Sequence, residues 1–438
     1  MLSSNLATPI DAGAGGGTVA GMVTRRIEAV VATRRTEVQV LALQGPRAVG
    51  KTTLLRAVAS AAGVHVIDLD DLATRGAVTA DPALFAAGSP PVCVDEFQKV
   101  PEILDAIKAE LNVDGSAGRF IITGSTRHDA LPRAAQSLTG RMHTVPVYPL
   151  SQGELAGTHE NYIERLLEDP DATTRTAALS VTTREEYVGR ITVGGFPLVA
   201  SLSPAARRRW FDDYVAASLE RDVTELANIR QREALPRLLN RLAGQTAQLL
   251  DITNAASSVN LPERTANTYT KLLEAVFLVY RLPAWGKTLR SRAGATPKLH
   301  VVDSGLAARL LRLTPALLAS KDPTALQQFG HLMETFAVWE IIKQTSWLDQ
   351  APDIGHYRTR DGIEADLVLE EDDGSVTAFE FKTAGRVSKK DFGGLRSLRA
   401  ALGNRFKAGV VFYTGERSYT YDDRLHVQPL DRLWTTVV

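Results

Sequence analysis

Gly45-Pro-Arg-Ala-Val-Gly-Lys-Thr52 matches the pattern G-x-x-x-x-G-K-[S/T] of a phosphate-binding loop at every defined position. An apolar strand pattern at residues 38–43 precedes the match, and a helical pattern at residues 53–62 follows it. In such a unit the backbone amides and the helix N-terminus face phosphate oxygens, while the lysine reaches the β- and γ-phosphates. The motif therefore predicts a nucleotide-binding set that consists of Gly45, Pro46, Arg47, Ala48, Val49, Gly50, Lys51, Thr52 and Thr53.

A second motif supplies the acidic groups that phosphoryl transfer requires. Pro91-Val-Cys-Val-Asp-Glu96 is an apolar strand pattern that ends in two carboxylates. In phosphoryl transfer one acid holds magnesium and another orients the attacking water. We therefore expect Asp95 and Thr52 to bind Mg²⁺, and Glu96 to act on the water.

Hydroxyl groups end a third strand pattern, at Phe120-Ile-Ile-Thr-Gly-Ser125. Polar side chains at this position can contact the γ-phosphate or the attacking water, so Thr123 and Ser125 join Glu96 as catalytic candidates. The ligands that these motifs predict are ATP and Mg²⁺.

The overall composition is that of an ordinary globular protein. The chain has 438 residues, of which 44% are hydrophobic and 23% charged, and its 50 basic residues balance 50 acidic ones. The length accommodates about three domains, and the composition excludes a disordered, collagen-like or coiled-coil chain. Because the net charge is zero, a nucleic-acid surface would have to come from local segregation of charge.

Cysteine use and hydropathy indicate the compartment. Cys93 is the single cysteine, so no internal disulfide can form, and no Cys/His cluster has zinc spacing. The first residues lack a secretion signal, and no apolar run reaches the ~18 residues that a membrane span needs. We therefore expect a cytoplasmic protein with no membrane partner.

Short apolar segments alternate with helical patterns between residues 38 and 147, which predicts an α/β fold with a parallel sheet and crossover helices. The expected strands are Val38–Leu43, Val64–Leu69, Val92–Val94, Phe120–Ile122 and Met142–Val147. The chain divides into a flexible tail at 1–21, a P-loop ATPase core at 22–157, a connector and helical lid at 158–228, a winged-helix candidate at 229–300, a linker at 301–328 and a C-terminal α/β domain at 329–438.

The central segment carries an excess of basic residues. Residues 204–300 contain 15 Lys and Arg against nine Asp and Glu. Leu261-Pro-Glu-Arg-Thr-Ala-Asn267 predicts a polar turn before a helix at 268–280, as in the recognition helix of a winged helix, and residues 281–298, which end at Lys298, predict the wing. The alternative is a packed helical connector with solvated arginines. The candidate contacts to DNA are Arg264, Asn267, Lys271, Lys287, Arg290 and Arg292.

Four residues of the C-terminal segment follow the order acid, Asp, Glu-x-Lys that is typical of a PD-(D/E)XK nuclease core. They are Glu334 on a predicted helix, Asp366 at a strand start, and Glu380 and Lys382 on the next strand. Carboxylates that converge on magnesium, with a lysine that positions water, could cleave DNA. The spacing is loose, and the same fold also serves as a passive binding module, so both roles stay open.

Further motifs are spread over nearly the whole chain: Val92-Cys-Val-Asp-Glu-Phe-Gln-Lys-Val-Pro101, Thr123-Gly-Ser125, Leu138-Thr-Gly-Arg141, Gly194-Gly-Phe-Pro197 and Arg221-Asp222. With the phosphate loop, they make the chain resemble an AAA+ ATPase of the archaeal-type branch, in which a C-terminal nuclease-like domain of unknown function follows the AAA module. The resemblance implies a homo-oligomer, a hexameric ring, in which Arg141 is an arginine finger for a neighbouring site. A helix-capping role is the alternative for Arg141. The resemblance also implies that Pro197 borders the adenine.

These features lead to one main hypothesis and two alternatives. The main hypothesis is an ATP-hydrolysing AAA+ motor of the translocase or branch-migration type, which binds duplex or branched DNA in repair or recombination. The first alternative is an ATP-regulated, metal-dependent DNA nuclease. The second is an ATP-controlled signalling or defence switch without motor activity. DNA-stimulated ATP turnover, metal-dependent nicking and slow DNA-independent turnover would distinguish the three.

Overall fold

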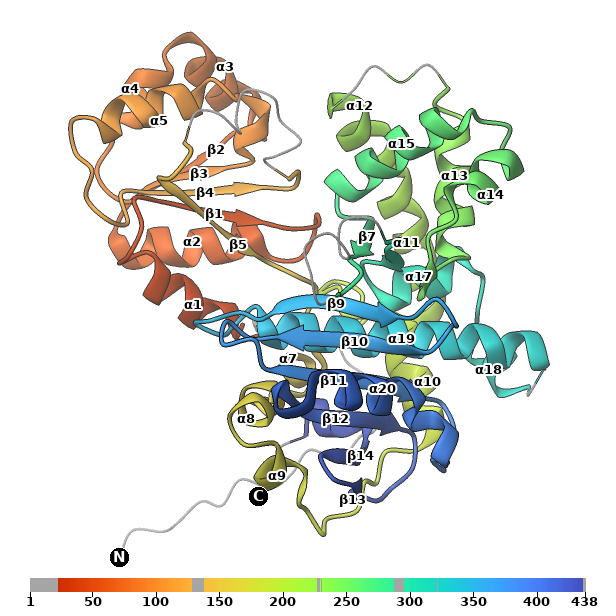
Figure 1. Ribbon diagram of the computed structural model, residues 1–438. Coiled ribbons are helices and arrows are strands. Elements are labelled where there is room, and N and C mark those ends of the chain that lie inside the picture. The colour runs from red at the N-terminus through yellow and green to blue at the C-terminus, as the bar shows by residue number, and fades with distance from the viewer. Residues whose placement is uncertain are drawn as a thin grey trace, which may run out of the picture.

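The computed structural model describes residues 23–127, 138–226, 229, 231–286, 295–320 and 322–435. The tail predicted at residues 1–21 lies outside these ranges. Figure 1 shows a parallel α/β core in red and orange at the upper left, a helical central unit in green at the upper right, and a C-terminal sheet in blue below both. In the described part of the chain, no helix is both long and apolar enough to cross a membrane.

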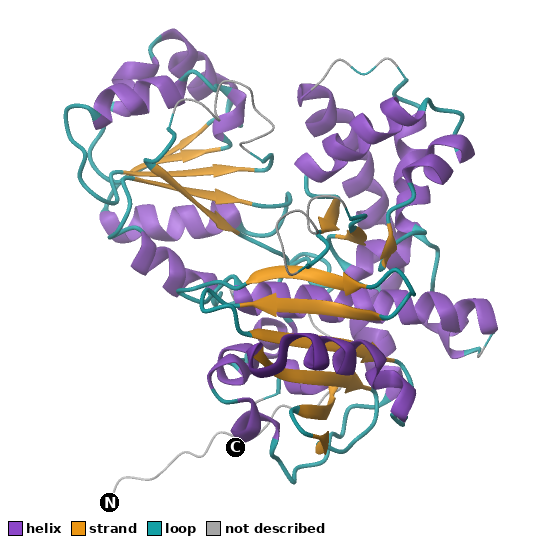
Figure 2. Ribbon diagram, in the orientation of Figure 1, coloured by secondary structure: helices purple, strands orange, loops and turns teal. Residues whose placement is uncertain are grey.

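The N-terminal core is a five-stranded parallel sheet in the order β2-β3-β4-β1-β5, which confirms the predicted α/β fold. Helices cover both of its faces (Figure 2), and the inner strands are buried along their whole length, which is why they are continuous apolar runs. The elements are α1 (Ile27–Arg34), β1 (Val40–Gln44), α2 (Lys51–Ala62), β2 (Val66–Asp68), α3 (Leu72–Ala80), α4 (Pro82–Ala86), β3 (Val92–Asp95), α5 (Ile103–Leu111), β4 (Phe120–Gly124) and β5 (Met142–Pro146).

The parallel register brings the three sequence motifs to one edge of this sheet. The phosphate loop follows β1, the acidic pair begins at the last residue of β3, and the hydroxyl pair lies at the end of β4. Leu43 of β1 is paired with Thr123 of β4, so the ends of these two strands are level. Ligands of open α/β sheets bind at this carboxyl edge.

Four helices that follow the core pack against the C-terminal domain. They are α7 (Gln152–Ala156), α8 (Tyr162–Glu168), α9 (Pro170–Thr174) and α10 (Arg184–Val193). Thr174 Oγ1 lies 3.0 Å from His426 Nδ1, and Ser180 Oγ donates to Asp431 Oδ2 over 2.6 Å. The first part of the predicted connector at 158–228 therefore completes the C-terminal domain instead of linking two units.

The central unit combines helices with a small antiparallel sheet in the order β6-β8-β7. The predicted helix at 268–280 is shifted, because Pro262 caps a helix that already begins at Glu263, and Phe277, with φ at +57°, turns the chain into a strand. The elements are α11 (Pro204–Ala217), the π-helical segment η3 (Ser218–Asp222), α12 (Val223–Leu226), α13 (Ala234–Ala243), β6 (Gln248–Leu249), α14 (Ile252–Ser258), α15 (Glu263–Ala275), β7 (Val279–Leu282) and β8 (Lys298–Val301).

Residues 301–328 were predicted to be a linker, but they fold into the helices α17 (Ser304–Leu310) and α18 (Pro315–Ala319). Leu306 and Ala307 of α17 are fully buried. After α19 (Pro323–Thr345) comes a mixed six-stranded sheet in the order β13-β14-β12-β11-β10-β9. Its elements are β9 (Asp353–Arg358), β10 (Glu364–Glu370), β11 (Val376–Lys382), α20 (Gly393–Leu402), β12 (Phe406–Tyr413), β13 (Tyr419–Asp422), β14 (Leu425–Pro429) and the 3₁₀ turn η6 (Leu430–Leu433).

Candidate functional site

The two glycines of the phosphate loop are required for different reasons, close packing at Gly45 and backbone conformation at Gly50. A Cβ on Gly45 would lie 1.9 Å from the carbonyl oxygen of Val147, and Gly50 has a φ of +96°, in the left-handed region that favours glycine. Gly50 directly precedes α2, so the turn leads the chain into the helix N-terminus. The loop thus has the strand–loop–helix geometry that binds phosphate groups.

Lys51 is buried inside the loop and is held only weakly by neutral groups. Its ammonium group donates to the carbonyl oxygens of Gly45 over 3.0 Å and Pro46 over 2.7 Å, and the residue is 4% exposed. Burial lowers the pKa of Lys51. Carbonyl oxygens do not neutralise a positive charge, so the site favours an anionic ligand.

The predicted magnesium ligands are in contact with one another. Asp95, the last residue of β3, accepts hydrogen bonds from the hydroxyls of Thr52 and Thr123. Burial raises the pKa of Asp95, and the two hydroxyl donors oppose this effect. A carboxylate and a hydroxyl beside a phosphate loop fit Mg²⁺, which takes oxygen ligands and is usually bound by one or two carboxylates together with substrate phosphates.

Glu96 is turned toward the end of β4. Its φ is +55°, and its Oε2 accepts a hydrogen bond from Ser125 Oγ over 2.8 Å. Gln98 Nε2 donates to the same carboxylate and, over 3.0 Å, to Ser125 Oγ. Gln98 was not among the predicted site residues, although it belongs to the quoted motif that begins at Val92. The three side chains form a hydrogen-bonded group beside the phosphate loop.

Arg47 joins the phosphate loop to the central unit. Its guanidinium group forms an ion pair with Asp222, the last residue of η3, with Nε 2.7 Å from each carboxylate oxygen. Although burial lowers the pKa of Arg47, the hydrogen bond and the charge of Asp222 outweigh it and raise that pKa. Isolated π-helical turns are frequent at functional sites. This ion pair identifies Asp222 as a site residue that the sequence motif named without a role.

Arg141 and Pro197 lie apart from these contacts. Arg141 precedes β5, at the opposite edge of the sheet from the phosphate loop, where its guanidinium group donates to Asn112 Oδ1 over 2.9 Å. Pro197 follows a turn in which the amide of Gly195 donates to Asp303 Oδ2 over 2.7 Å. The roles predicted for Arg141 and Pro197 therefore stay predictions.

Three of the predicted DNA contacts share one exposed face. Arg264, Asn267 and Lys271 are exposed on α15, while Ala266 and Leu273 on its other side are buried. Three further candidates, Lys287, Arg290 and Arg292, lie outside the described residues.

The structure brings the four candidate nuclease residues together in what we call the carboxylate cluster, which consists of Glu334, Asp366, Glu380, Lys382 and Lys298. Lys298 is not on a DNA-facing wing, because its ammonium group lies 2.7 Å from Glu334 Oε1 and 2.9 Å from Asp366 Oδ1. Lys382 lies 2.6 Å from Glu380 Oε1. Burial and the neighbouring Asp366 raise the pKa of Glu334 to about 8. The sequence pattern missed Lys298 as a member, because its partners Glu334 and Asp366 lie 36 and 68 residues further along the chain.

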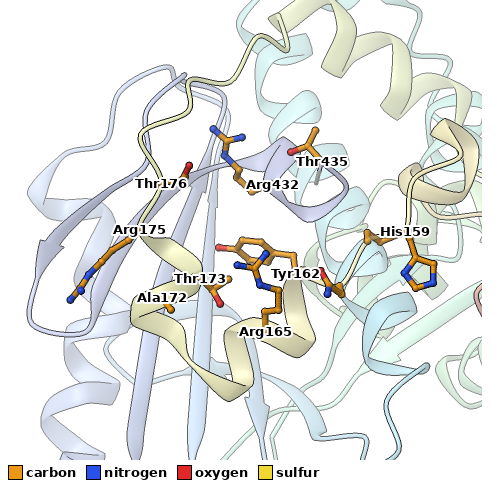
Figure 3. Close-up of a pocket in the computed structure, with 11 residues that line it drawn as sticks. His159, Tyr162, Arg165, Ala172, Thr173, Arg175, Thr176, Arg432 and Thr435 are labelled. Atoms are coloured by element: carbon orange, nitrogen blue, oxygen red, sulfur yellow. The ribbon is translucent and has the colours of Figure 1, made fainter. Parts of the chain in front are cut away.

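A separate pocket of about 120 Å³ lies between α8, α9 and the end of the chain (Figure 3). Arg165, Arg175 and Arg432 line it together with Tyr162 and Thr435. Ligand pockets for drug-sized molecules have volumes of about 300–1,000 Å³, so this one is too small for a nucleotide. It is separate from the phosphate loop.

The parallel sheet and the strand–loop–helix geometry are those of a phosphate-binding P-loop core. In agreement, residues 37–156 match the family model of an AAA domain. Residues 184–317 match a domain of unknown function (DUF8612), and residues 329–433 match another (DUF4143). The chain thus combines an AAA domain with a C-terminal DUF4143 domain. The last match supports the predicted C-terminal domain but not its predicted nuclease-like character.

Whole-chain relatives carry no assigned function. Uncharacterized protein Rv2008c of Mycobacterium tuberculosis is 28% identical over 421 residues, which are 95% of this chain and 86% of that protein, and uncharacterized protein Mb2031c of Mycobacterium bovis gives the same values.

Two solved structures share parts of the fold. The Walker-type ATPase PABY2304 of Pyrococcus abyssi has 15% identity and a TM-score of 0.41 over 66% of this chain and 96% of its own. The RuvB Holliday junction branch migration motor of Thermotoga maritima has 16% identity and a TM-score of 0.27 over 59% and 88%. At these scores the similarities carry no argument about function.

Proposed function

We propose that the protein is an ATP-hydrolysing AAA+ motor that binds DNA through its central unit, of the translocase or branch-migration type that serves repair or recombination. One observation carries this proposal. Arg127, two residues after Ser125, donates its backbone amide to the carbonyl oxygen of Ala275 over 2.9 Å, and its guanidinium group lies 5.6 Å from the centre of the Phe277 ring. The segment that follows β4, whose end contacts Glu96, is thus hydrogen-bonded to the last residue of α15.

The residues of the site suit the hydrolysis of ATP. Lys51 would neutralise charge on the β- and γ-phosphates, and Thr52 and Asp95 would hold Mg²⁺, which when bound neutralises developing charge on the phosphate oxygens. Glu96 would orient the attacking water, with Thr123 and Ser125 fixing the two carboxylates. Hydrolysis would then change the partners of Ser125, and Arg127 would transmit this change to α15.

A homo-oligomer would complete the site. Arg141 lies too far along the sheet to serve its own phosphate loop, since it precedes β5 while the loop follows β1. In a ring, a hexamer by the resemblance, Arg141 would reach the neighbouring subunit's site, where an arginine stabilises transition-state charge. By the same resemblance, Pro197 would border the adenine at the start of the helical lid.

The order of elements in the central unit supports a winged helix. Helix α13 is followed by β6, α14, α15 and then the antiparallel strands β7 and β8. In such modules the helix in the place of α15 enters the major groove. The exposed Arg264, Asn267 and Lys271 repeat at helical spacing on this helix, so they can face DNA together.

The test is DNA binding over a salt titration. We expect the double variant Arg264→Ala/Lys271→Ala to bind duplex and branched DNA about tenfold more weakly, with the log–log salt slope reduced by about 2, because two phosphate contacts are lost. The matched control is Arg237→Ala/Arg241→Ala, two exposed arginines on α13, which should bind like the parent. Equal binding by the double variant and the parent would contradict the role of α15.

A second candidate function is an ATP-controlled switch. The side chains of the site are already engaged, since Glu96 is bonded to Ser125 and Gln98, and Arg47 to Asp222. In a switch, these bonds would hold the nucleotide-free arrangement of the site, and turnover would be slow. A turnover rate that DNA does not change, with no binding of DNA by the full chain, would select the switch over the motor.

A further inference from the structure

The carboxylate cluster contains one lysine, Lys298, that comes from a different unit of the fold. Lys298 is the first residue of β8 in the central unit, whereas Glu334 lies on α19 and Asp366 on β10. The side chain of Lys298 is 3% exposed, and its ammonium group is in ion pairs with both carboxylates. The ion pairs of Lys298 therefore join two units of the fold.

A divalent metal does not fit the cluster in this arrangement. Mg²⁺ requires oxygen ligands at about 2.0–2.1 Å in octahedral order, but the ammonium group already stands between Glu334 and Asp366. The second oxygen of Asp366 accepts the amide of Phe381 over 3.0 Å. In the ranges that the structure describes, no group of three His, Cys, Asp or Glu residues is placed to hold a metal ion.

The backbone of Lys298 is held in a sheet of the central unit. Its backbone lies between Leu249 of β6 and Leu282 of β7 in the register of the small sheet. Just beyond β7 the chain pairs with the C-terminal sheet: the amide of His356 donates to Pro283 over 2.9 Å, and the amide of Trp285 donates to His356 over 2.6 Å. Backbone pairing and the ion pairs thus fix the same interface.

We propose that Lys298 is a built-in cation that takes the place of the divalent metal of a nuclease-like site, so that the carboxylate cluster latches the central unit to the C-terminal domain and does not cleave DNA. A buried ammonium group between two carboxyl groups donates a hydrogen bond to each of them without a free ion. Removal of one partner leaves uncompensated buried charge, so the latch contributes most to stability when it is complete. The proposal goes beyond ATP-driven DNA binding and stands independently of it.

The first experiment uses the full-length parent chain and asks for a metal site directly. Mn²⁺ binding, measured without nucleotide by electron paramagnetic resonance, and nicking of supercoiled plasmid with Mg²⁺ or Mn²⁺ are compared between the parent and Asp366→Asn. We expect the same Mn²⁺ binding in both proteins and no nicking by either. Mn²⁺ binding or nicking that Asp366→Asn removes would overturn the proposal.

The second experiment measures the latch by thermal unfolding. Lys298→Met keeps the length of the side chain but removes the charge, and we expect it to lower the unfolding midpoint by about 5 °C or more. Adding Glu334→Gln and Asp366→Asn removes the uncompensated charges and should restore at least half of the loss. Lys108→Met, at an exposed lysine of α5, is the control and should leave the midpoint unchanged.

The parent-chain metal test does not depend on Lys298→Met. If Lys298→Met fails to fold, a triple variant that folds supports the latch, and a triple variant that also fails to fold overturns it. An unchanged midpoint in a folded Lys298→Met would overturn the latch. A triple variant less stable than Lys298→Met would do the same.

Discussion

Lys51 and Lys298 are both buried beside carboxylates, but they are held in opposite ways. The Lys51 ammonium group is bonded to two backbone carbonyl oxygens, and burial lowers its pKa. The Lys298 ammonium group is bonded to two carboxylates, whose charges outweigh burial and raise its pKa. The first lysine keeps a charge that an outside anion can neutralise, while the charge of the second is already neutralised within the chain.

The difference distinguishes an open site, whose lysine can still bind an outside anion, from a closed site, whose lysine is already paired with carboxylates. Both regions hold a lysine and at least two acids, so the residue types alone do not separate them. The partner of the lysine separates them. An ammonium group held by neutral dipoles gains more interaction energy from a phosphate than an ammonium group already paired with carboxylates. The phosphate loop therefore offers its lysine to an outside anion, whereas Lys298 is already paired within the chain.

The comparison predicts the largest loss of activity for Lys51→Ala. Without this charge the β- and γ-phosphates lose their main neutralising group, so ATP turnover should fall by about 1,000-fold or more and nucleotide binding should weaken. Phosphate release and titration with a fluorescent nucleotide measure the two effects. Lys298→Met should keep turnover per folded molecule within about twofold, so equal losses in both variants would break the comparison.

Arg141 tests whether the open site is completed by a second copy of the chain. Arg141→Ala should slow turnover by about 1,000-fold, which is the lower end for an arginine finger. Mixing it with Lys51→Ala subunits should restore part of the rate, because some interfaces then pair an intact loop with an intact Arg141. Intact oligomers without any recovery would show that Arg141 acts through Asn112 alone, as a structural residue.

Glu96→Gln sharpens the comparison by separating hydrolysis from binding. The amide can keep the contact with Ser125 but cannot take a proton from water, so turnover should fall by about 100-fold with nucleotide affinity within twofold of the parent. Single-turnover hydrolysis and equilibrium binding give the two numbers. A parallel loss of affinity would place Glu96 in nucleotide binding instead.

Asp222→Asn should give the smallest effect. It removes the charge that competes with phosphates for Arg47 but keeps a hydrogen-bonding group, so the Kd for ATP should fall about threefold, as expected for ~0.7 kcal/mol. Asp212→Asn is the matched control, because Asp212 pairs with Arg309 on the same side of the central unit, away from the loop. Weaker ATP binding in Asp222→Asn would mean that the ion pair instead holds the loop in shape.

The candidate nucleotide site could be predicted from the sequence because each of its motifs is a short contiguous segment. Gly45 to Thr52 is one contiguous turn, and Asp95, Glu96, Thr123 and Ser125 each end an apolar strand, so parallel pairing brings them to one edge. The contacts between these motifs and distant segments of the chain could not be predicted. Asp222 meets Arg47 across 175 residues of sequence, and no local pattern specifies that encounter.

The C-terminal region shows the same limit more strongly. The order of acids correctly placed Glu334, Asp366 and Glu380 together, but Lys298 looked like one more basic residue of a wing. Its burial depends on how the central unit docks, which is a tertiary property. Strands β13 and β14 were not among the predicted elements, because both are short, Tyr419–Asp422 is exposed along its whole length and Leu425–Pro429 ends in a proline.

The packing of α8 and α9 on the C-terminal domain has a consequence for how the chain is made. Ser180 is 251 residues earlier in the chain than its partner Asp431. At roughly 5–20 residues per second, a ribosome needs about 13–50 s to synthesise the sequence between them. During that interval Ser180 and the face of α9 that packs on β14 have no partner, so a nascent chain would benefit from a chaperone at this segment.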